Sequence, residues 1–99
     1  MDLNKSIRLA VDSGEVVLGT DKTKKLALTG KAKIVVLSSN ALREQAQDVK
    51  HYCSLSKTPL VVFHGTSIEL GTICGKPFPI SALSVINEGN SDIMQAAKQ

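Results

Sequence analysis

One stretch near the start of the chain has the residue types and spacing that suit an anion. Gly19 follows the apolar run 16–18 and allows the backbone to turn sharply. Thr20 or Asp21 can then cap the first N–H groups of a helix. Because a helix N-terminus carries partial positive charge and free N–H donors, anions bind there readily. The stretch therefore predicts an anion-binding turn.

Lysines are concentrated beside this turn. Lys22 and Lys25 are three positions apart, which places them on one face of the expected helix. Residues 1–33 hold seven Lys/Arg against four Asp/Glu, whereas residues 34–99 hold five against five, so the net charge of +3 belongs to the first third. Any single lysine is as well explained by a solvated helix face. The clustering indicates a local anionic partner.

The residue types that could carry out catalysis or bind a metal are not spaced for either function in this sequence. Residues 19–23 contain the lysine and threonine of a phosphate loop, but the four-residue spacer and the second glycine are missing. His51 and His64 have no identifiable nucleophile or carboxylate partner. Cys53 and Cys74 lack neighbouring ligands at metal spacing, which favours buried, reduced thiols. We expect neither an enzyme nor a metal or cofactor site.

Alternating helices and strands must position these residues. The expected strands are apolar, at 15–18, 34–37, 60–63 and 82–86. Helices are expected at about 3–13 and 21–29, after a cap at Asn40, from the capping-box spacing of Thr66 and Glu69, and after a cap at Asn90 or Ser91. This order predicts one domain over residues 1–99 with an α/β fold, a three-layer α/β/α sandwich around a four-stranded mixed sheet.

Such a sandwich brings the loops at the carboxyl ends of its strands to one edge, where ligands usually bind. Three loops of this kind are expected here, at 19–22, 38–40 and 64–66, and each leads into a polar-capped helix start. The edge therefore offers clustered N–H donors next to lysines.

These loops favour binding of a nucleic acid, though not by stacking of bases on an aromatic sheet face. The chain has no Trp, one Tyr and two Phe, which excludes an aromatic sheet face as in the RNA-recognition motif. Helix N-termini and lysines would contact phosphates, and the amide of Asn40 can read a base edge. Phe78 lies between Pro77 and Pro79, so it either packs in the core or forms an apolar tip on a loop.

Several segments resemble the L30e family of archaeal and eukaryotic ribosomal proteins. They are Leu18–Thr20 with the lysine-bearing helix, Ser39–Asn40, Gly65–Thr72, Gly75–Phe78 and Asn87–Ile93. The Gly65–Thr72 block is the specific part, whereas the first turn is shared with the wider L7Ae group of kink-turn-binding proteins. The short segment before the first helix is more typical of archaeal members.

The resemblance implies an α/β/α protein that grips a kink-turn in ribosomal RNA. The loops at the carboxyl ends of its strands would contact the RNA backbone, its phosphates and its bases. The residues that it assigns to RNA binding are Gly19, Thr20, Lys22, Lys25, Asn40, Phe78, Pro79 and Ile80. Close members commonly carry a basic residue where this chain has Asp21, which puts a phosphate contact there in doubt. Asp21 is then expected to act only as the helix cap.

The expected setting is the large ribosomal subunit in the cytoplasm, with ribosomal RNA and other large-subunit proteins as partners and a monomer when free. No apolar run approaches the ~20 residues of a membrane span, and no charged-then-apolar leader opens the chain. The alternatives are a related kink-turn-binding protein of a non-ribosomal ribonucleoprotein, a small phosphate- or nucleotide-binding domain, and a purely structural interaction protein.

Overall fold

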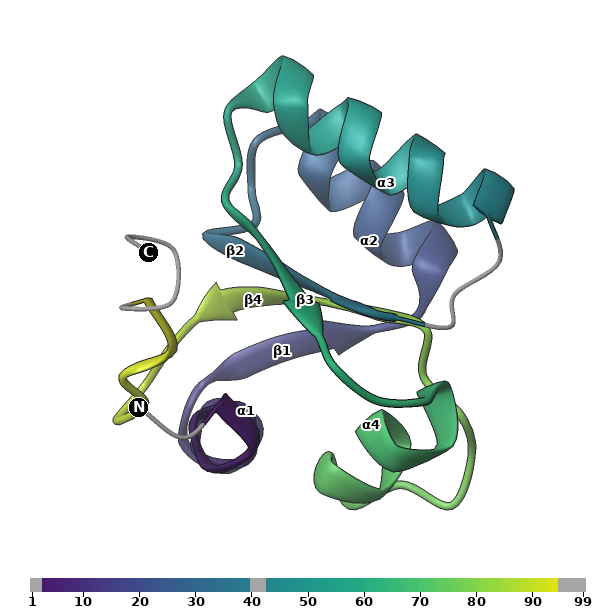
Figure 1. Ribbon diagram of the computed structural model, residues 1–99. Coiled ribbons are helices and arrows are strands. Elements are labelled where there is room, and N and C mark those ends of the chain that lie inside the picture. Colours follow the sequence, from purple (N-terminus) through teal and green to yellow (C-terminus); the bar gives the residue numbers. More distant parts are fainter. Residues whose placement is uncertain (1–2, 40–42, 95–99) are drawn as a thin grey trace.

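The computed structural model describes residues 3–39 and 43–94, and it confirms the expected α/β fold (Figure 1). In chain order the elements are α1 (Leu3–Ser13), β1 (Glu15–Leu18), α2 (Thr20–Leu28), β2 (Ile34–Ser38), α3 (Arg43–Ser56), β3 (Leu60–Phe63), α4 (Ser67–Ile73) and β4 (Ala82–Asn87). Ser91 accepts a hydrogen bond from the N–H of Ile93 in a short turn, and the rest of the helix expected after Asn90 or Ser91 falls on residues outside the described range. None of the described helices is long and apolar enough to cross a bilayer.

The strand order places the loops that matter on one edge. The sheet runs β1-β4-β2-β3, with β4 antiparallel to both of its neighbours and β2 parallel to β3. Strands β1, β2 and β3 therefore share one direction. Their carboxyl ends lie at the end of the sheet where β4 begins, as the pairs Leu18–Leu83 and Leu37–Ala82 show. The expected gathering of the three loops is confirmed, and the segment before β4 joins them.

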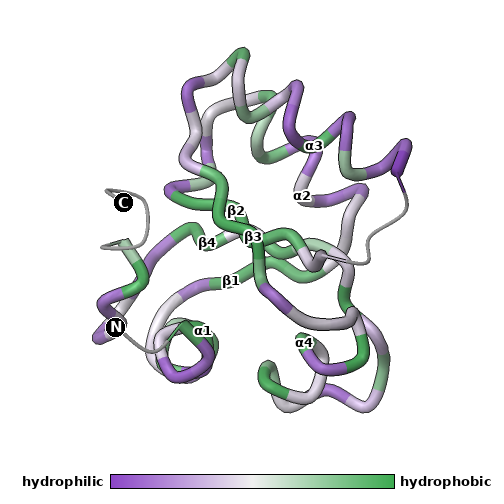
Figure 2. The backbone as a smooth tube through the Cα atoms, viewed as in Figure 1, coloured by the Kyte–Doolittle hydropathy of each residue, from purple (hydrophilic) through white to green (hydrophobic). Residues whose placement is uncertain are grey.

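Helices cover both faces of the sheet. Helices α1 and α4 lie on one face, and α2 and α3 lie on the other (Figure 1). Hydrophobic residues concentrate along the strands, while hydrophilic residues recur along α3 (Figure 2). Ile7 and Leu70 pack on the first face, and Ala27 and Val49 pack on the second. Both core clusters are continuous with the central strands, so the loops that leave these strands are anchored from both faces of the sheet.

One expectation about burial is wrong. The continuous apolar run 16–18 is typical of a strand covered on both faces, but β1 is an edge strand in which residues 16–18 are only half-buried. By contrast, every residue of β2 is buried because β2 lies inside the sheet. In α2, either Ala27 or Leu28 was expected to be buried, and the structure decides for Ala27, because Leu28 is 56% exposed. The buried residues of that helix are Thr23 and Ala27, one turn apart on the face toward the sheet.

We predict that Thr23→Val stabilises the protein. Thr23 is fully buried, and its hydroxyl has no hydrogen-bond partner among the described residues. An unsatisfied buried polar group costs roughly 1–3 kcal/mol, and valine has nearly the same shape without the hydroxyl, so a gain of about 1 kcal/mol is expected. Urea unfolding measures it as a higher midpoint with an unchanged slope. Thr29→Val is the control because the Thr29 hydroxyl donates to the Lys25 carbonyl. A lower midpoint for Thr23→Val would contradict the prediction.

Candidate nucleic-acid interface

The turn after β1 is held by the backbone alone. Gly19 has φ +118°, a conformation that favours glycine, and its N–H donates to the carbonyl of Ala82 at 3.0 Å. The expected cap at Thr20 or Asp21 is wrong, because α2 already begins at Thr20 and Gly19 is the N-cap. No side chain makes a capping hydrogen bond there. The start of α2 therefore presents N–H donors that no side-chain cap covers.

Side chains do not obstruct this turn. A Cβ added at Gly19 would have no heavy atom within 4 Å, so a ligand can approach the backbone closely. Asp21 is exposed in the first turn of α2. A carboxylate in that position interacts favourably with the helix dipole, which gives Asp21 a role even without capping.

Some lysines of the basic segment are neutralised by ion pairs. The Nζ of Lys24 is 3.2 Å from Asp48 Oδ2, and the Nζ of Lys33 is 3.1 Å from Glu88 Oε2. Lys33 precedes β2, at the edge of the sheet away from the Gly19 turn. The backbone N–H of Glu88, together with the Lys33 ammonium, lowers the pKa of the Glu88 carboxyl.

The two lysines that the resemblance assigns to RNA binding, Lys22 and Lys25, are not neutralised in this way by any described residue. Lys22 and Lys25 are exposed, and neither forms an ion pair within the described part of the chain. Both follow Gly19 within two turns of α2. Their charge is therefore available to an anionic partner at this edge.

The loops after β2 and β3 are tied to each other. The N–H of Ser39 donates to the Phe63 carbonyl at 3.0 Å, and the Ser39 hydroxyl donates to the Gly65 carbonyl at 2.9 Å. Asn40 comes next in the chain but lies outside the described residues, so its base contact stays a prediction. The expected cap of α4 is confirmed, because Thr66 Oγ1 accepts the N–H of Glu69 at 3.1 Å.

The segment before β4 presents an apolar tip. Phe78 is 50% exposed, which decides its placement in favour of the surface, and the neighbouring Pro79 is exposed too. Both line a shallow cleft with Ile68, which is 70% exposed on α4. The sequence pattern missed Ile68, because its proximity to Phe78 exists only in three dimensions.

Ile80 must be removed from the surface contacts. Its side chain is only 2% exposed and belongs to the core, and its N–H donates to the Ser67 carbonyl at 3.0 Å. A side chain packed in the core cannot also contact a nucleotide. Ile80 instead supports the Phe78 tip from beneath. We call the turns 19–22, 38–39, 64–66 and 76–81 together the loop edge.

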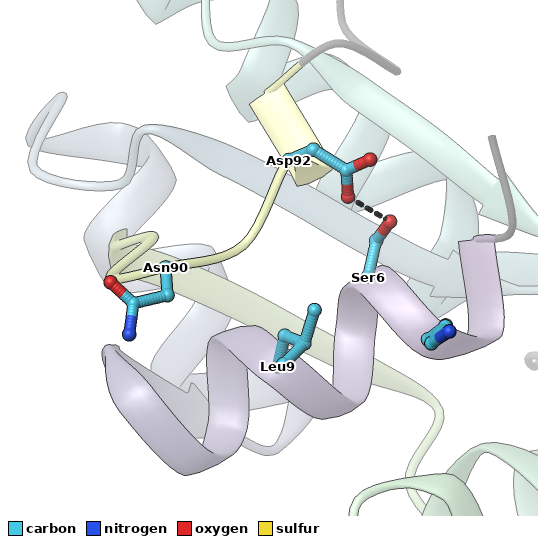
Figure 3. A pocket seen from close by; sticks show the side chains of 5 residues that line it. Ser6, Leu9, Asn90 and Asp92 are labelled. Carbon is cyan, nitrogen blue, oxygen red and sulfur yellow. Dashed lines mark hydrogen bonds between the residues drawn. The ribbon is translucent and has the colours of Figure 1, made fainter.

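A second cleft lies away from the loop edge, between α1 and the segment that follows β4 (Figure 3). Leu9 and Asn90 are among the residues that line it, and the Ser6 hydroxyl donates to the Asp92 carboxylate there. These contacts attach the chain after β4 to α1. The cleft is at the far end of β4 and takes no part in the loop edge.

The cysteines are unsuited to catalysis. Burial raises the pKa of the Cys74 thiol to about 11 and also raises the pKa of the Cys53 thiol. Such thiols stay protonated near neutral pH and are poor nucleophiles. Among the residues that the structure describes, no three His, Cys, Asp or Glu side chains gather in a way that could hold a metal ion.

This arrangement defines an α/β protein with exposed lysines and uncapped backbone N–H groups among the loops at one end of its sheet. The chain belongs to the ribosomal protein L7Ae/L30e/S12e/Gadd45 family, whose family model matches residues 1–95. The resemblance to L30e proteins is thereby confirmed.

Three curated relatives illustrate the similarity, and each is named large ribosomal subunit protein eL30. The protein of Methanocaldococcus jannaschii is 48% identical over 99 residues, which is 100% of this chain and 90% of the relative. That of Methanothermobacter thermautotrophicus is 42% identical, covering 96% and 97% of the two chains. That of Methanopyrus kandleri is 36% identical, covering 99% and 90%. These relatives are named as ribosomal proteins and not as enzymes, and the chain is not an enzyme.

Proposed function

We propose that this protein is a constituent of the large ribosomal subunit and binds a kink-turn in ribosomal RNA through the loop edge. The names of the relatives support the ribosomal part. The observation that carries the RNA-binding part is the strand order, which brings the loops that follow three parallel strands, and the loop that precedes β4, to one side of the sheet. Ribosomal RNA and neighbouring large-subunit proteins in the cytoplasmic ribosome are the proposed partners.

Phosphates are the proposed ligands of the turn after β1. The open surface at Gly19 and the uncapped start of α2 let the RNA backbone come within hydrogen-bond distance of N–H groups. Thr20 begins that helix, and Lys22 and Lys25 bring positive charge along one of its faces. Contacts of this kind position an RNA without reading its sequence.

Unpaired bases are the proposed ligands of the other loops. A sharply bent RNA exposes bases that can pack on apolar or aromatic side chains, and Phe78 with Pro79 presents such a surface. Asn40 is the proposed reader of a base edge, through the paired donor and acceptor of its amide. Recognition is proposed to depend on the shape of the bent RNA, which presents phosphates and unpaired bases to these loops together. We further propose that the free protein is a monomer.

The decisive experiment is a binding titration with a kink-turn RNA and with a straight duplex of equal length, at two salt concentrations. Tight binding to the kinked RNA with much weaker binding to the duplex would support recognition of shape by the loop edge. Equal, weak and strongly salt-dependent binding to both RNAs would mean that only the lysines act, and the proposed function would fall. Co-purification with large ribosomal subunits distinguishes the ribosomal role from a related role in another ribonucleoprotein.

Lys25→Gln should reduce the salt dependence of binding to the kink-turn RNA. Loss of one phosphate contact lowers the slope of log K against log salt by about one unit, because one fewer counterion is released. Lys33→Gln is the matched control, since Lys33 is paired with Glu88 and precedes β2 at the far edge. Filter binding or fluorescence anisotropy at four salt concentrations measures the slopes. Equal slopes for Lys25→Gln and the wild type would remove Lys25 from the phosphate contacts.

A further inference from the structure

A chain of serine hydroxyls crosses the loop edge beneath its surface. The Oγ of Ser67 lies 3.1 Å from the Oγ of Ser38 and 3.1 Å from the Oγ of Ser81, within hydrogen-bond distance of both. Ser38 ends β2, Ser67 begins α4, and Ser81 immediately precedes β4. Ser38 is 2% exposed and Ser67 is 9% exposed. Three segments that are distant in the sequence therefore meet at one buried hydroxyl.

Backbone hydrogen bonds run parallel to this chain of hydroxyls. The N–H of Ser38 donates to the Ser81 carbonyl at 2.8 Å, and the N–H of Ile80 donates to the Ser67 carbonyl at 3.0 Å. The Phe78 tip lies two residues before Ile80, and the Ser39 turn directly follows Ser38. Ser67 thus connects the apolar tip to the turn after β2 without reaching the surface itself.

We propose that Ser67 is a positioning residue that holds the Phe78 tip and the turn after β2 in one fixed arrangement for RNA; this proposal rests on the proposed function. The Ser67 hydroxyl is the atom that both neighbouring serines approach, so one group sets the spacing of two loops. A surface whose loops are already ordered loses less conformational entropy on binding. The apparent Kd rises in inverse proportion to the fraction of molecules with the loops correctly placed.

Ser67→Ala and Ser81→Ala test the role of the hydroxyl chain at two strengths. Ser67→Ala removes the contacts to the hydroxyls of Ser38 and Ser81, whereas Ser81→Ala removes only the contact on the side of the Phe78 tip. Ser84→Ala is the matched control: Ser84 is also fully buried, but its hydroxyl approaches the Val17 carbonyl at 3.4 Å within the sheet. The milder Ser81→Ala keeps the test valid even if Ser67→Ala folds poorly.

Amide hydrogen exchange in the free protein provides the first readout. The two loop variants, Ser67→Ala and Ser81→Ala, should exchange the N–H of Ile80 faster than the wild type. Ser67→Ala should also exchange the N–H of Ser39 faster. The N–H of Lys33, which donates to the Val85 carbonyl at the far edge, should keep its wild-type rate relative to global unfolding. Ser84→Ala should leave the loop amides unchanged in the same comparison. Uniform acceleration at all of these amides would mean a general loss of stability and would overturn the positioning role.

Affinity for the kink-turn RNA, corrected for the folded fraction, is the second readout. If the substitution leaves the loops correctly placed in about one molecule in ten of Ser67→Ala, the Kd of this variant should rise about tenfold. Ser81→Ala should have a smaller effect and Ser84→Ala should match the wild type. A wild-type protein that prefers the kinked RNA, with both loop variants binding equally well, would overturn only the role of Ser67. A wild-type protein without that preference would overturn the proposed function itself.

Discussion

Gly71→Ala should lower the free energy of unfolding by about 1–3 kcal/mol, as expected when a side chain is forced into a packed site. A Cβ at this position would lie 2.1 Å from the Phe78 carbonyl oxygen and 3.2 Å from its carbonyl carbon. These are backbone atoms, so they cannot rotate aside as a flexible side chain would. Elsewhere in a helix the same substitution gains roughly 0.5–1 kcal/mol. The close approach of the Phe78 backbone therefore decides the sign.

Urea unfolding of Gly71→Ala beside Thr72→Ala provides the measurement. Thr72 is the next residue of α4, is exposed and lines the same cleft as Phe78, but its replacement by alanine removes atoms and places none against the Phe78 backbone. We expect a clear loss for Gly71→Ala and a change within about 0.5 kcal/mol for Thr72→Ala. The Phe78 tip must also move away from α4, so kink-turn binding at equal folded fraction should weaken. A Gly71→Ala protein as stable as the wild type would mean that the Phe78 segment does not rest on α4.

Asn40→Ala should weaken binding to the kink-turn RNA by about 1–3 kcal/mol, the discrimination that a bidentate contact to a base provides. This corresponds to roughly a five- to 150-fold increase in Kd. The substitution removes both the donor and the acceptor of the amide, so the base edge loses its partner altogether. Asn40 itself lies outside the described residues; it directly follows Ser39, whose hydroxyl donates to the Gly65 carbonyl at the loop edge.

Asn90→Ala is the control for this prediction. Asn90 is an exposed asparagine beyond the far end of β4, and its backbone N–H, which the substitution retains, donates to the Ser13 hydroxyl. Because Asn40 is also the expected cap of the third helix, we expect Asn40→Ala to unfold at a lower urea concentration, and the two variants are compared at equal folded fraction. Titration against the same kink-turn RNA should then separate them, with Asn90→Ala close to the wild type. If Asn40→Ala also binds like the wild type, the base contact is assigned to the wrong residue.

Several elements were determined by the local sequence. The bounds Glu15–Leu18 and Leu60–Phe63 agree with the strands predicted from apolar runs, and the capping role of Thr66 agrees with its spacing to Glu69. The complete burial of β2 also agrees with its uninterrupted apolar run Ile34–Leu37. These features depend on residues within one turn or one strand, so backbone preference and side-chain hydrogen bonding suffice to predict them.

Other features were decided by the tertiary structure. The apolar run of β1 resembles that of β2, yet β1 is half-buried, because only the strand order shows which strand lies at an edge. Gly19 instead of Thr20 caps α2, since the turn is set by the hydrogen bond to Ala82 on β4. The sequence cannot determine such contacts from local preferences, because their partners are more than 60 residues away.

The division is clearest in the residues proposed to bind RNA. The sequence by itself determined the basic turn, the α/β alternation and the family. The insertion of β4 between β1 and β2 decided that Phe78 joins the loop edge, and core packing decided that Ile80 does not reach its surface. The meeting of Ser38, Ser67 and Ser81 is likewise visible only in three dimensions. Chain-local chemistry selects the elements, whereas long-range packing selects which of their side chains face a partner.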